Sequence, residues 1–268
     1  MAGRLTRLVQ NLRRNIGPGT PLDRHLQRFA GLAGRFGAGL DLLAALYGTD
    51  KFGEHEYTSV YEGLMAASRR RPVRLLEVGV GGFAESLGGE SLRMWASYFR
   101  RGQVFGIDVL DKTALSAGRV RVFQCSQVDA PKLTELAQAH GPFDFIIDDG
   151  SHVNAHQIQT FGTLWPHLRD GGAYIVEDVQ TSYWPSYGGG VLGTPAYEKS
   201  CMRWFKELAD SVNIPEFLEP PPARLDPAIG SVTFHHNLIV LTKDLAPRYT
   251  NAPLDDPAMR PQFFQPGG

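Results

Sequence analysis

Short apolar runs alternate with stretches of helical periodicity through the central part of the chain. The run 74–78 is bounded by proline and glycine, which is typical of a buried strand, and Leu92, Trp95 and Phe99 then recur at helical spacing. The predicted strands are 74–78, 104–107, 120–123, 143–147, 173–176, 231–234 and 238–241, and the predicted helices are 92–99, 131–139, 153–168 and 199–212. Strands that alternate with helices predict an α/β fold with a doubly wound, mostly parallel sheet of seven strands.

Other segments surround this predicted domain, which we place at residues 71–243. Residues 1–70 have helical periodicity, and their first stretch is a basic amphipathic helix that we expect to pack on the body or on a partner subunit. This expectation favours a homodimer or a higher homo-oligomer. The aromatic, glycine-rich segment 179–198 is predicted to be a mobile lid, and the proline-rich residues 244–268 an irregular tail.

Composition narrows the class of protein. The 268 residues include 27 basic and 28 acidic side chains, a formal net charge of −1, so bulk attraction to nucleic acid is not expected. Only two cysteines occur, Cys125 and Cys201, which indicates a reducing compartment and favours the cytoplasm. No apolar run has the length of a membrane span.

The first predicted strand ends in a glycine-rich turn that begins with an acid. Gly79 and Gly81 allow tight turning and let a ligand lie against bare backbone. Together with Ala84 they satisfy the loose G-x-G-x-x-G/A form, so an NAD(P)-dependent oxidoreductase is one alternative. Glu77, two residues before the first glycine, is not required by a dinucleotide site but can accept hydrogen bonds from an ammonium group.

The next two strands also end in polar residues. Asp108 is placed to accept the hydroxyls of an adenosine ribose, since ligands of open α/β sheets bind beyond the carboxyl ends of the strands. Ser126, Gln127 and Asp129 follow the third strand. They are candidates for adenine contacts, and a helix-capping turn is an equally good interpretation.

Two pairs of acids follow the fourth and fifth strands. Asp148 and Asp149 end one strand, and Glu177 and Asp178 end the other. Gathered carboxylates repel one another unless a cation joins them, and hard oxygen ligands favour Mg²⁺ or a similar divalent ion. Carboxylates that cap helices are the alternative. His152 lies close to these acids in the sequence and is the best candidate for a general base, with a packing histidine as its alternative.

With these motifs the chain resembles the class I S-adenosylmethionine-dependent methyltransferases. The first glycine motif and Asp108 are similar to that family's cofactor-binding residues. The segment 148–152 together with Glu177 and Asp178 resembles the metal-dependent sugar O-methyltransferases of the mycinamicin macrolide-glycoside type, and mycobacterial methylmannose polysaccharide methyltransferases are possible kin. The resemblance covers roughly residues 46–242.

The resemblance implies an enzyme that methylates a sugar hydroxyl of a glycoside or a mannose-type oligo- or polysaccharide. It implies S-adenosylmethionine and Mg²⁺ as cofactors, with His152 as base and with Asp149, Glu177 and Asp178 as metal ligands. The residues implied around S-adenosylmethionine are Glu77, Gly79, Gly81, Asp108, Ser126, Gln127, Asp129 and Asp148, and those expected to contact the substrate are Tyr57, Tyr183 and Trp184. A non-catalytic binding protein on the same fold is the remaining alternative.

Overall fold

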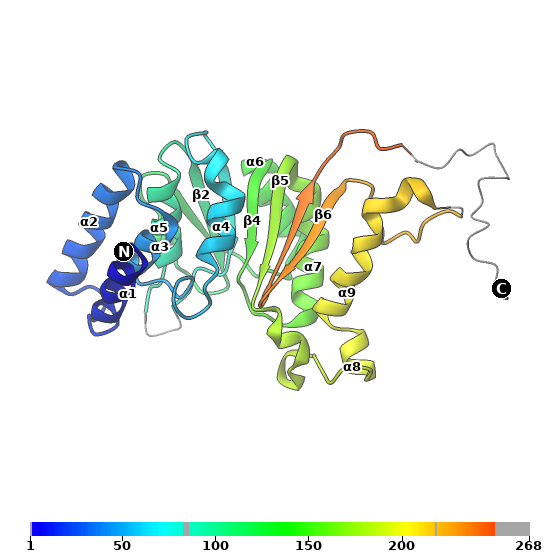
Figure 1. The fold of residues 1–268 in the computed structure, drawn as a ribbon, viewed down its shortest axis with the longest axis horizontal. Helices are drawn as coiled ribbons and strands as arrows, with labels where there is room; N and C mark the ends of the chain where they lie inside the picture. Colours follow the sequence, from blue (N-terminus) through cyan, green and yellow to red (C-terminus); the bar gives the residue numbers. More distant parts are fainter. Residues whose placement is uncertain (1, 83–85, 218, 250–268) are drawn as a thin grey trace, which may run out of the picture.

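The computed structural model describes residues 2–82, 86–217 and 219–249, and it contains one seven-stranded sheet (Figure 1). The strand order is β3-β2-β1-β4-β5-β7-β6, and only the pairings that involve β7 are antiparallel. The strands are β1 (Arg74–Val78), β2 (Gln103–Asp108), β3 (Val120–Gln124), β4 (Phe143–Asp148), β5 (Leu168–Glu177), β6 (Ile229–His235) and β7 (Leu238–Lys243). The predicted doubly wound, mostly parallel sheet is therefore confirmed.

Helices cover both faces of the sheet (Figure 1). Side chains alternate along a strand, so Leu75 packs in one buried cluster and Leu76 in the other. The first cluster includes side chains of the helices that precede β2 in the chain. The second includes side chains of α6, α7 and α9. The α-helices are α1 (Ala2–Arg13), α2 (Pro21–Arg35), α3 (Leu40–Tyr47), α4 (Thr58–Met65), α5 (Glu90–Tyr98), α6 (Ala130–His140), α7 (Asn154–Leu164), α8 (Pro195–Glu198) and α9 (Cys201–Leu208).

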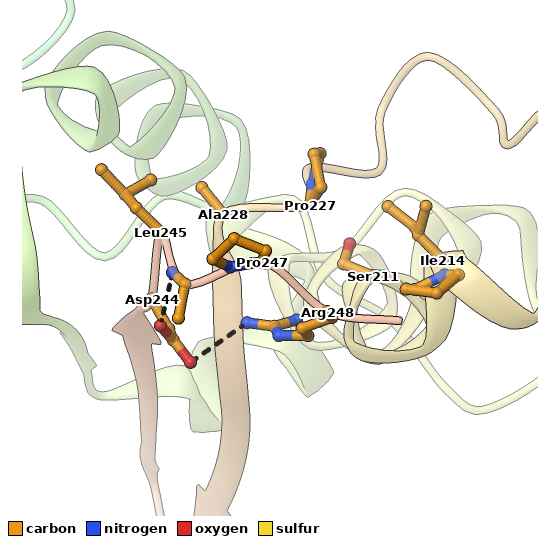
Figure 2. Close-up of a pocket in the computed structure, with 10 residues that line it drawn as sticks. Ser211, Ile214, Pro227, Ala228, Asp244, Leu245, Pro247 and Arg248 are labelled. Atoms are coloured by element: carbon orange, nitrogen blue, oxygen red, sulfur yellow. Dashed lines mark hydrogen bonds and ion pairs between the residues drawn. The ribbon is translucent and has the colours of Figure 1, made fainter. Parts of the chain in front are cut away.

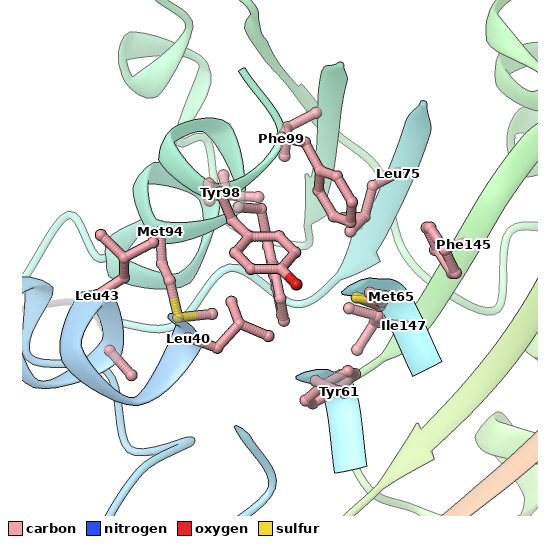
Figure 3. Packing of buried hydrophobic residues seen from close by; sticks show 14 of the residues in the cluster. Leu40, Leu43, Tyr61, Met65, Leu75, Met94, Tyr98, Phe99, Phe145 and Ile147 are labelled. Atoms are coloured by element: carbon pink, nitrogen blue, oxygen red, sulfur yellow. The ribbon is translucent and has the colours of Figure 1, made fainter. Parts of the chain in front are cut away.

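The N-terminal helices share the core of the sheet domain. Figure 3 shows Leu40 of α3 and Tyr61 of α4 in the same cluster as Leu75 and Phe145 from the sheet. Each of these four side chains is at most 5% exposed. Because α4 is fixed by this packing, the loop between α3 and α4 is held over the strand ends.

Three predicted elements have different boundaries in the structure. The helix predicted at 153–168 ends at Leu164, and Pro166 follows in a short 3₁₀ turn because proline offers no N–H to continue the helix. Strand β5 then begins at Leu168, before the predicted strand at 173–176. The helix predicted at 199–212 is α9 (Cys201–Leu208) followed by the 3₁₀ helix η6 (Ala209–Glu216).

The predicted lid segment contains short helices. It comprises η4 (Val179–Tyr183), η5 (Pro185–Tyr187) and α8. The buried side chain of Asn154 anchors this segment. Its amide nitrogen donates to the carbonyls of Thr181 and Tyr187, at 3.1 and 2.8 Å. None of the helices in the described part of the chain has the length and apolar character needed to cross a membrane.

The pocket in Figure 2 lies away from the acidic strand ends. It is lined by residues of η6 and by the segment that follows β7, including Asp244 and Arg248, whose side chains approach to 3.7 Å. Strand β7 runs antiparallel to β5, so the end of β7 lies beside the beginning of β5, whereas Glu177 lies at the end of β5. The pocket is thus at the opposite edge of the sheet, and we assign it no part in the candidate site.

Candidate functional site at the carboxyl ends of the strands

The glycine turn after β1 brings the backbone of two loops into contact. Gly79 has a φ of +83°, and a Cβ atom placed on it would lie 2.1 Å from the carbonyl oxygen of Asp149. Glycine is therefore required there both by conformation and by space. Gly81 has a φ of +66°, but a Cβ on it would meet nothing within 4 Å, so this glycine faces open space. Ala84 of the dinucleotide-like pattern lies outside the described residues.

We expect Gly79→Ala to destabilise the protein by about 2–4 kcal/mol, since it adds strain at positive φ to an overlap with backbone. The matched control is Gly171→Ala, because Gly171 has a φ of +70° and free space around its Cβ position. That variant should lose only about 1 kcal/mol. Urea denaturation measures both, and equal losses would contradict the close approach of the two loops.

Asp108 ends β2 beside this turn. One of its oxygens accepts the backbone N–H of Val80 at 3.3 Å, and the other accepts that of Leu110 at 2.9 Å. The buried ammonium of Lys112 lies 3.6 Å from Asp108 and donates to the carbonyls of Gly81 and Gly82. The turn and the acid are thus held together as one unit.

Glu77 is completely buried at the end of β1. Its Oε2 accepts a hydrogen bond from Ser91 at 2.8 Å, while its Oε1 has no hydrogen-bond partner and lies 3.4 Å from Lys51 Nζ. A buried carboxylate oxygen without a hydrogen bond is costly, and the ammonium group of a bound ligand would satisfy it. This orphaned oxygen and the open space at Gly81 fit the binding of an amino-acid cofactor such as S-adenosylmethionine.

Lys51 lies at the centre of a buried carboxylate cluster. Its Nζ is 2.7 Å from Asp149 Oδ2 and 2.8 Å from both oxygens of Glu177, and the hydroxyl of Tyr61 also donates to Glu177. Burial lowers the pKa of Lys51, but Asp149, Glu177 and Glu77 outweigh it and raise that pKa well above its usual value. Burial raises the pKa values of all three acids. For all three acids, therefore, the loss of hydration on burial outweighs the stabilisation that Lys51 gives to the carboxylate.

Asp149, His152 and Asp178 meet at one point beside this cluster. One ligand atom from each lies within 4.8 Å of the others, and His152 Nε2 is 3.9 Å from Asp149 Oδ1 and 3.6 Å from Asp178 Oδ2. Both His152 and Asp178 have positive φ angles, +56° and +55°. Strain of this kind in non-glycine residues gathers at functional sites. The two carboxylates offer the oxygen ligands that a divalent cation such as Mg²⁺ takes, and the imidazole of His152 lies beside them.

Glu177 is the third predicted metal ligand, and its carboxylate is not in that group. Both of its oxygens lie on Lys51, and one also accepts from Tyr61. It is adjacent in sequence to Asp178 and shares Lys51 with Asp149. Glu177 therefore borders the candidate metal centre from its buried side.

The remaining predicted cofactor residues support the turn after β4. Gln127 donates to Asp148 at 3.3 Å and accepts the backbone N–H of Ser151 at 2.6 Å. Burial raises the pKa of Asp148 to about 7. Asp129 accepts the backbone N–H of Lys132 and so caps α6, and Ser126 Oγ accepts from the backbone of Val128. The helix-capping interpretation therefore describes the contacts of Asp129.

The predicted substrate residues lie in two different settings. Tyr57 is 2% exposed, and its hydroxyl donates to Asp178 Oδ1 at 2.7 Å, so its ring offers no free face to a sugar. Tyr183 and Trp184 are 41% and 48% exposed, and the ring of Tyr183 stacks on Tyr197. The lid segment thus presents two aromatic side chains to solvent.

Three residues of the site were not among the predicted site residues. They are Lys51, Tyr61 and His55, whose Nδ1 lies 3.5 Å from Asp178 Oδ1. All three come from the loop after α3 or from α4. Lys51 and His55 lie in a polar stretch between two apolar helical stretches, and this pattern does not show where their side chains point.

Comparison with known proteins agrees with this geometry. Residues 76–179 match a family profile described as "Methyltransferase domain". That part of the chain is thus similar to a methyltransferase domain. It is 43% identical, over 78% of its length, to 8-demethyl-8-alpha-L-rhamnosyl tetracenomycin-C 2′-O-methyltransferase of Streptomyces olivaceus, covering 56% of that protein. It is 40% identical, over 76% of its length, to mycinamicin VI 2″-O-methyltransferase of Micromonospora griseorubida, covering 52% of that protein.

A solved structure shows the same fold. The methyltransferase MycE of the mycinamycin pathway, in complex with Mg, SAH and mycinamycin VI, superposes with a TM-score of 0.71 at 38% identity. The match covers 77% of this chain and 55% of that one. The predicted Rossmann-like fold of class I methyltransferases and the predicted resemblance to sugar O-methyltransferases are both confirmed. The chain spans about half the length of the curated relatives it matches.

Proposed function

We propose that this methyltransferase transfers a methyl group from S-adenosylmethionine to a sugar hydroxyl of a glycoside, with the help of Mg²⁺ or a similar divalent cation. The observation that carries the proposal is the meeting of Asp149, His152 and Asp178 beside the glycine turn. It is supported by two relatives whose names describe O-methylation in glycosylated natural products. Because those names specify glycosides, we favour a glycoside acceptor over a mannose polysaccharide.

The methyl donor is assigned to the turn after β1. Glu77 Oε1, which makes an ion pair with Lys51 but has no hydrogen bond, is assigned to the donor's ammonium group, and Gly81 leaves open space beside the backbone. Asp108 is assigned to the ribose hydroxyls, and the turn at 126–129 and Asp148 to the adenine side of the same site. Bound S-adenosylmethionine supplies an electrophilic methyl group on a sulfonium centre.

The divalent cation is assigned to Asp149 and Asp178, with Glu177 at its buried border. When bound, such an ion lowers the pKa of a sugar hydroxyl. His152 takes the proton, and the carboxylates of Asp149 and Asp178, at 3.9 and 3.6 Å, stabilise the imidazolium that results. Tyr183 and Trp184 are assigned to the faces of the acceptor, and segment 179–198 would shield the bound acceptor from water.

A methyl-transfer screen tests this function. The protein is incubated with S-adenosylmethionine, Mg²⁺ and separate panels of polyketide glycosides and mannose oligosaccharides, and mass spectrometry locates the added methyl group. We expect a gain of one methyl on a sugar oxygen of a glycoside. Transfer only to mannose oligosaccharides would overturn the acceptor assignment, and transfer to neither would overturn the function.

Calorimetric titration distinguishes this proposal from the two alternatives, an NAD(P)-dependent oxidoreductase and a non-catalytic binding protein. We expect S-adenosylhomocysteine to bind and NAD⁺ not to bind, because Glu77 suits an ammonium group and not a pyrophosphate. Binding of NAD⁺ alone would favour the oxidoreductase. Cofactor binding without turnover on any acceptor would favour a non-catalytic binding protein.

We also propose that the chain forms a homodimer or a larger homo-oligomer through α2. Leu22, Phe29 and Leu32 recur along this helix and are 55%, 56% and 50% exposed. Exposed apolar stripes of this kind mark protein interfaces. Light scattering after size exclusion should give a multiple of the monomer mass, and Phe29→Asp should shift it to the monomer. A monomeric parent protein would contradict the proposal.

We place the protein in the cytoplasm, where S-adenosylmethionine is available. Cys125 and Cys201 are both buried and free, as expected of a protein kept in a reducing compartment. Cell fractionation followed by detection of the chain tests this placement.

A further inference from the structure

Lys51 is a completely buried lysine that the proposed reaction does not use. It lies on the loop between α3 and α4, yet its ammonium reaches acids at the ends of β1 and β5 and just after β4. The loop is held there by the packed helix α4 and the core around Tyr61 (Figure 3), by Phe52 in the same core, and by a hydrogen bond from Gln10 to the carbonyl of Phe52. A lysine loses its hydration when it is buried, so such a position persists only where several carboxylates replace the water.

The two carboxylate oxygens of Asp149 have different partners, and one of these partners is Lys51. Oδ2 lies 2.7 Å from Lys51 Nζ, while Oδ1 faces His152 Nε2 at 3.9 Å. The two carboxylate oxygens of Asp178 also have different partners. Its Oδ1 accepts from Tyr57 at 2.7 Å, and its Oδ2 lies 3.6 Å from His152. In each acid one oxygen is fixed from the α3–α4 side, and the other points to the candidate metal centre.

The carboxylate of Glu177 has hydrogen-bond donors on both of its oxygens. Both oxygens lie 2.8 Å from Lys51 Nζ, and Tyr61 donates to one of them. A buried carboxylate with this set of donors is positioned without help from a metal. Lys51 is the cation common to Glu177 and Asp149.

We propose that Lys51 is a positioning residue and the resident counter-ion of the metal site. It holds Asp149 and Glu177 in place before a divalent cation arrives, and it leaves Asp149 Oδ1 as the oxygen that faces the centre. This inference rests on the proposed metal site. It predicts that removing the ammonium leaves Glu77, Asp149 and Glu177 without their shared cation, so that a bound divalent cation compensates more of their charge than in the parent protein.

The test is thermal unfolding of the full chain in EDTA and in Mg²⁺. Lys51→Met keeps the length of the side chain but removes the charge. We expect the variant to melt well below the parent protein in EDTA, and its rise in Tm on adding Mg²⁺ to be at least about twice that of the parent. A rise equal to or smaller than that of the parent would overturn the inference, since a merely structural lysine would lower both melting temperatures alike.

Lys112→Met is the matched control, because Lys112 is a second buried lysine that pairs with Asp108 and backbone carbonyls. It should lower the Tm and leave the Mg²⁺-induced rise at the parental value. An enlarged rise in this control would show that loss of any buried ammonium has the effect, and would contradict a specific role for Lys51.

A double variant keeps the inference testable if Lys51→Met does not fold. Lys51→Met combined with Glu177→Gln removes the ammonium together with one carboxylate. We expect the double variant to be more stable in EDTA than Lys51→Met alone, because residues in direct contact are not additive. Additive losses would refute the counter-ion role. This cycle needs no metal, so it tests Lys51 even if the parent protein shows neither methyl transfer nor a response to Mg²⁺.

Discussion

His152→Ala should lower kcat for methyl transfer by about 10²–10⁴-fold, because a positioned general base contributes a factor of that size. The expectation rests on the place of Nε2 between the carboxylates of Asp149 and Asp178, at 3.9 and 3.6 Å. Affinity for S-adenosylhomocysteine should stay within about twofold of the parent, since the carboxylates that His152 faces, Asp149 and Asp178, are assigned to the cation and not to the cofactor. Steady-state kinetics and calorimetry measure the two quantities.

His167→Ala is the control for this substitution. His167 lies in the 3₁₀ turn before β5, at the edge of the sheet opposite the candidate site. It should retain the parental kcat. If His152→Ala also turned over at the parental rate, His152 would not be the base.

Asp149→Asn should lower Mg²⁺-dependent methyl transfer by about 10³-fold, which corresponds to the several kcal/mol that a bound metal contributes. The substitution removes the charge of the only carboxylate in the described part of the chain that joins the candidate metal centre to Lys51. We also expect weaker binding of Mn²⁺, used as a spectroscopic probe of the same site. Kinetics and electron paramagnetic resonance titration check the two effects.

Asp170→Asn makes the same chemical change at a distant position. Asp170 accepts the backbone N–H of Leu245, close to the beginning of β5. This control should keep both activity and Mn²⁺ affinity. Parental Mn²⁺ affinity in Asp149→Asn would exclude Asp149 as a ligand.

The fold was predictable because its signals are local. Each strand of the sheet contains a short apolar run, and the acids and glycines that end the strands are adjacent to those runs in the sequence. The start of β5 was missed because residues 169–172 are polar or glycine and lie before its apolar part. Leu168 pairs with Phe143 of β4 and Ala173 pairs with Phe145, with an irregularity between them, and no pattern within the segment shows that pairing.

The site was predictable only in part, for a related reason. Asp149, His152 and Asp178 could be grouped because parallel strands end at one edge of a sheet. Lys51 could not, since 126 residues separate it from Glu177 and its place depends on the packing of α3 and α4. The same packing buries Tyr57 and turns a predicted sugar contact into a partner of Asp178.

The central claim is that methyl transfer to a glycoside depends on the cation-binding acids at the strand ends. Its most direct test uses methyl-labelled S-adenosylmethionine and a glycoside acceptor, first in EDTA and then after Mg²⁺ is restored. The account predicts no labelled product in EDTA and full recovery with Mg²⁺. Equal product formation in EDTA and in Mg²⁺ would contradict it.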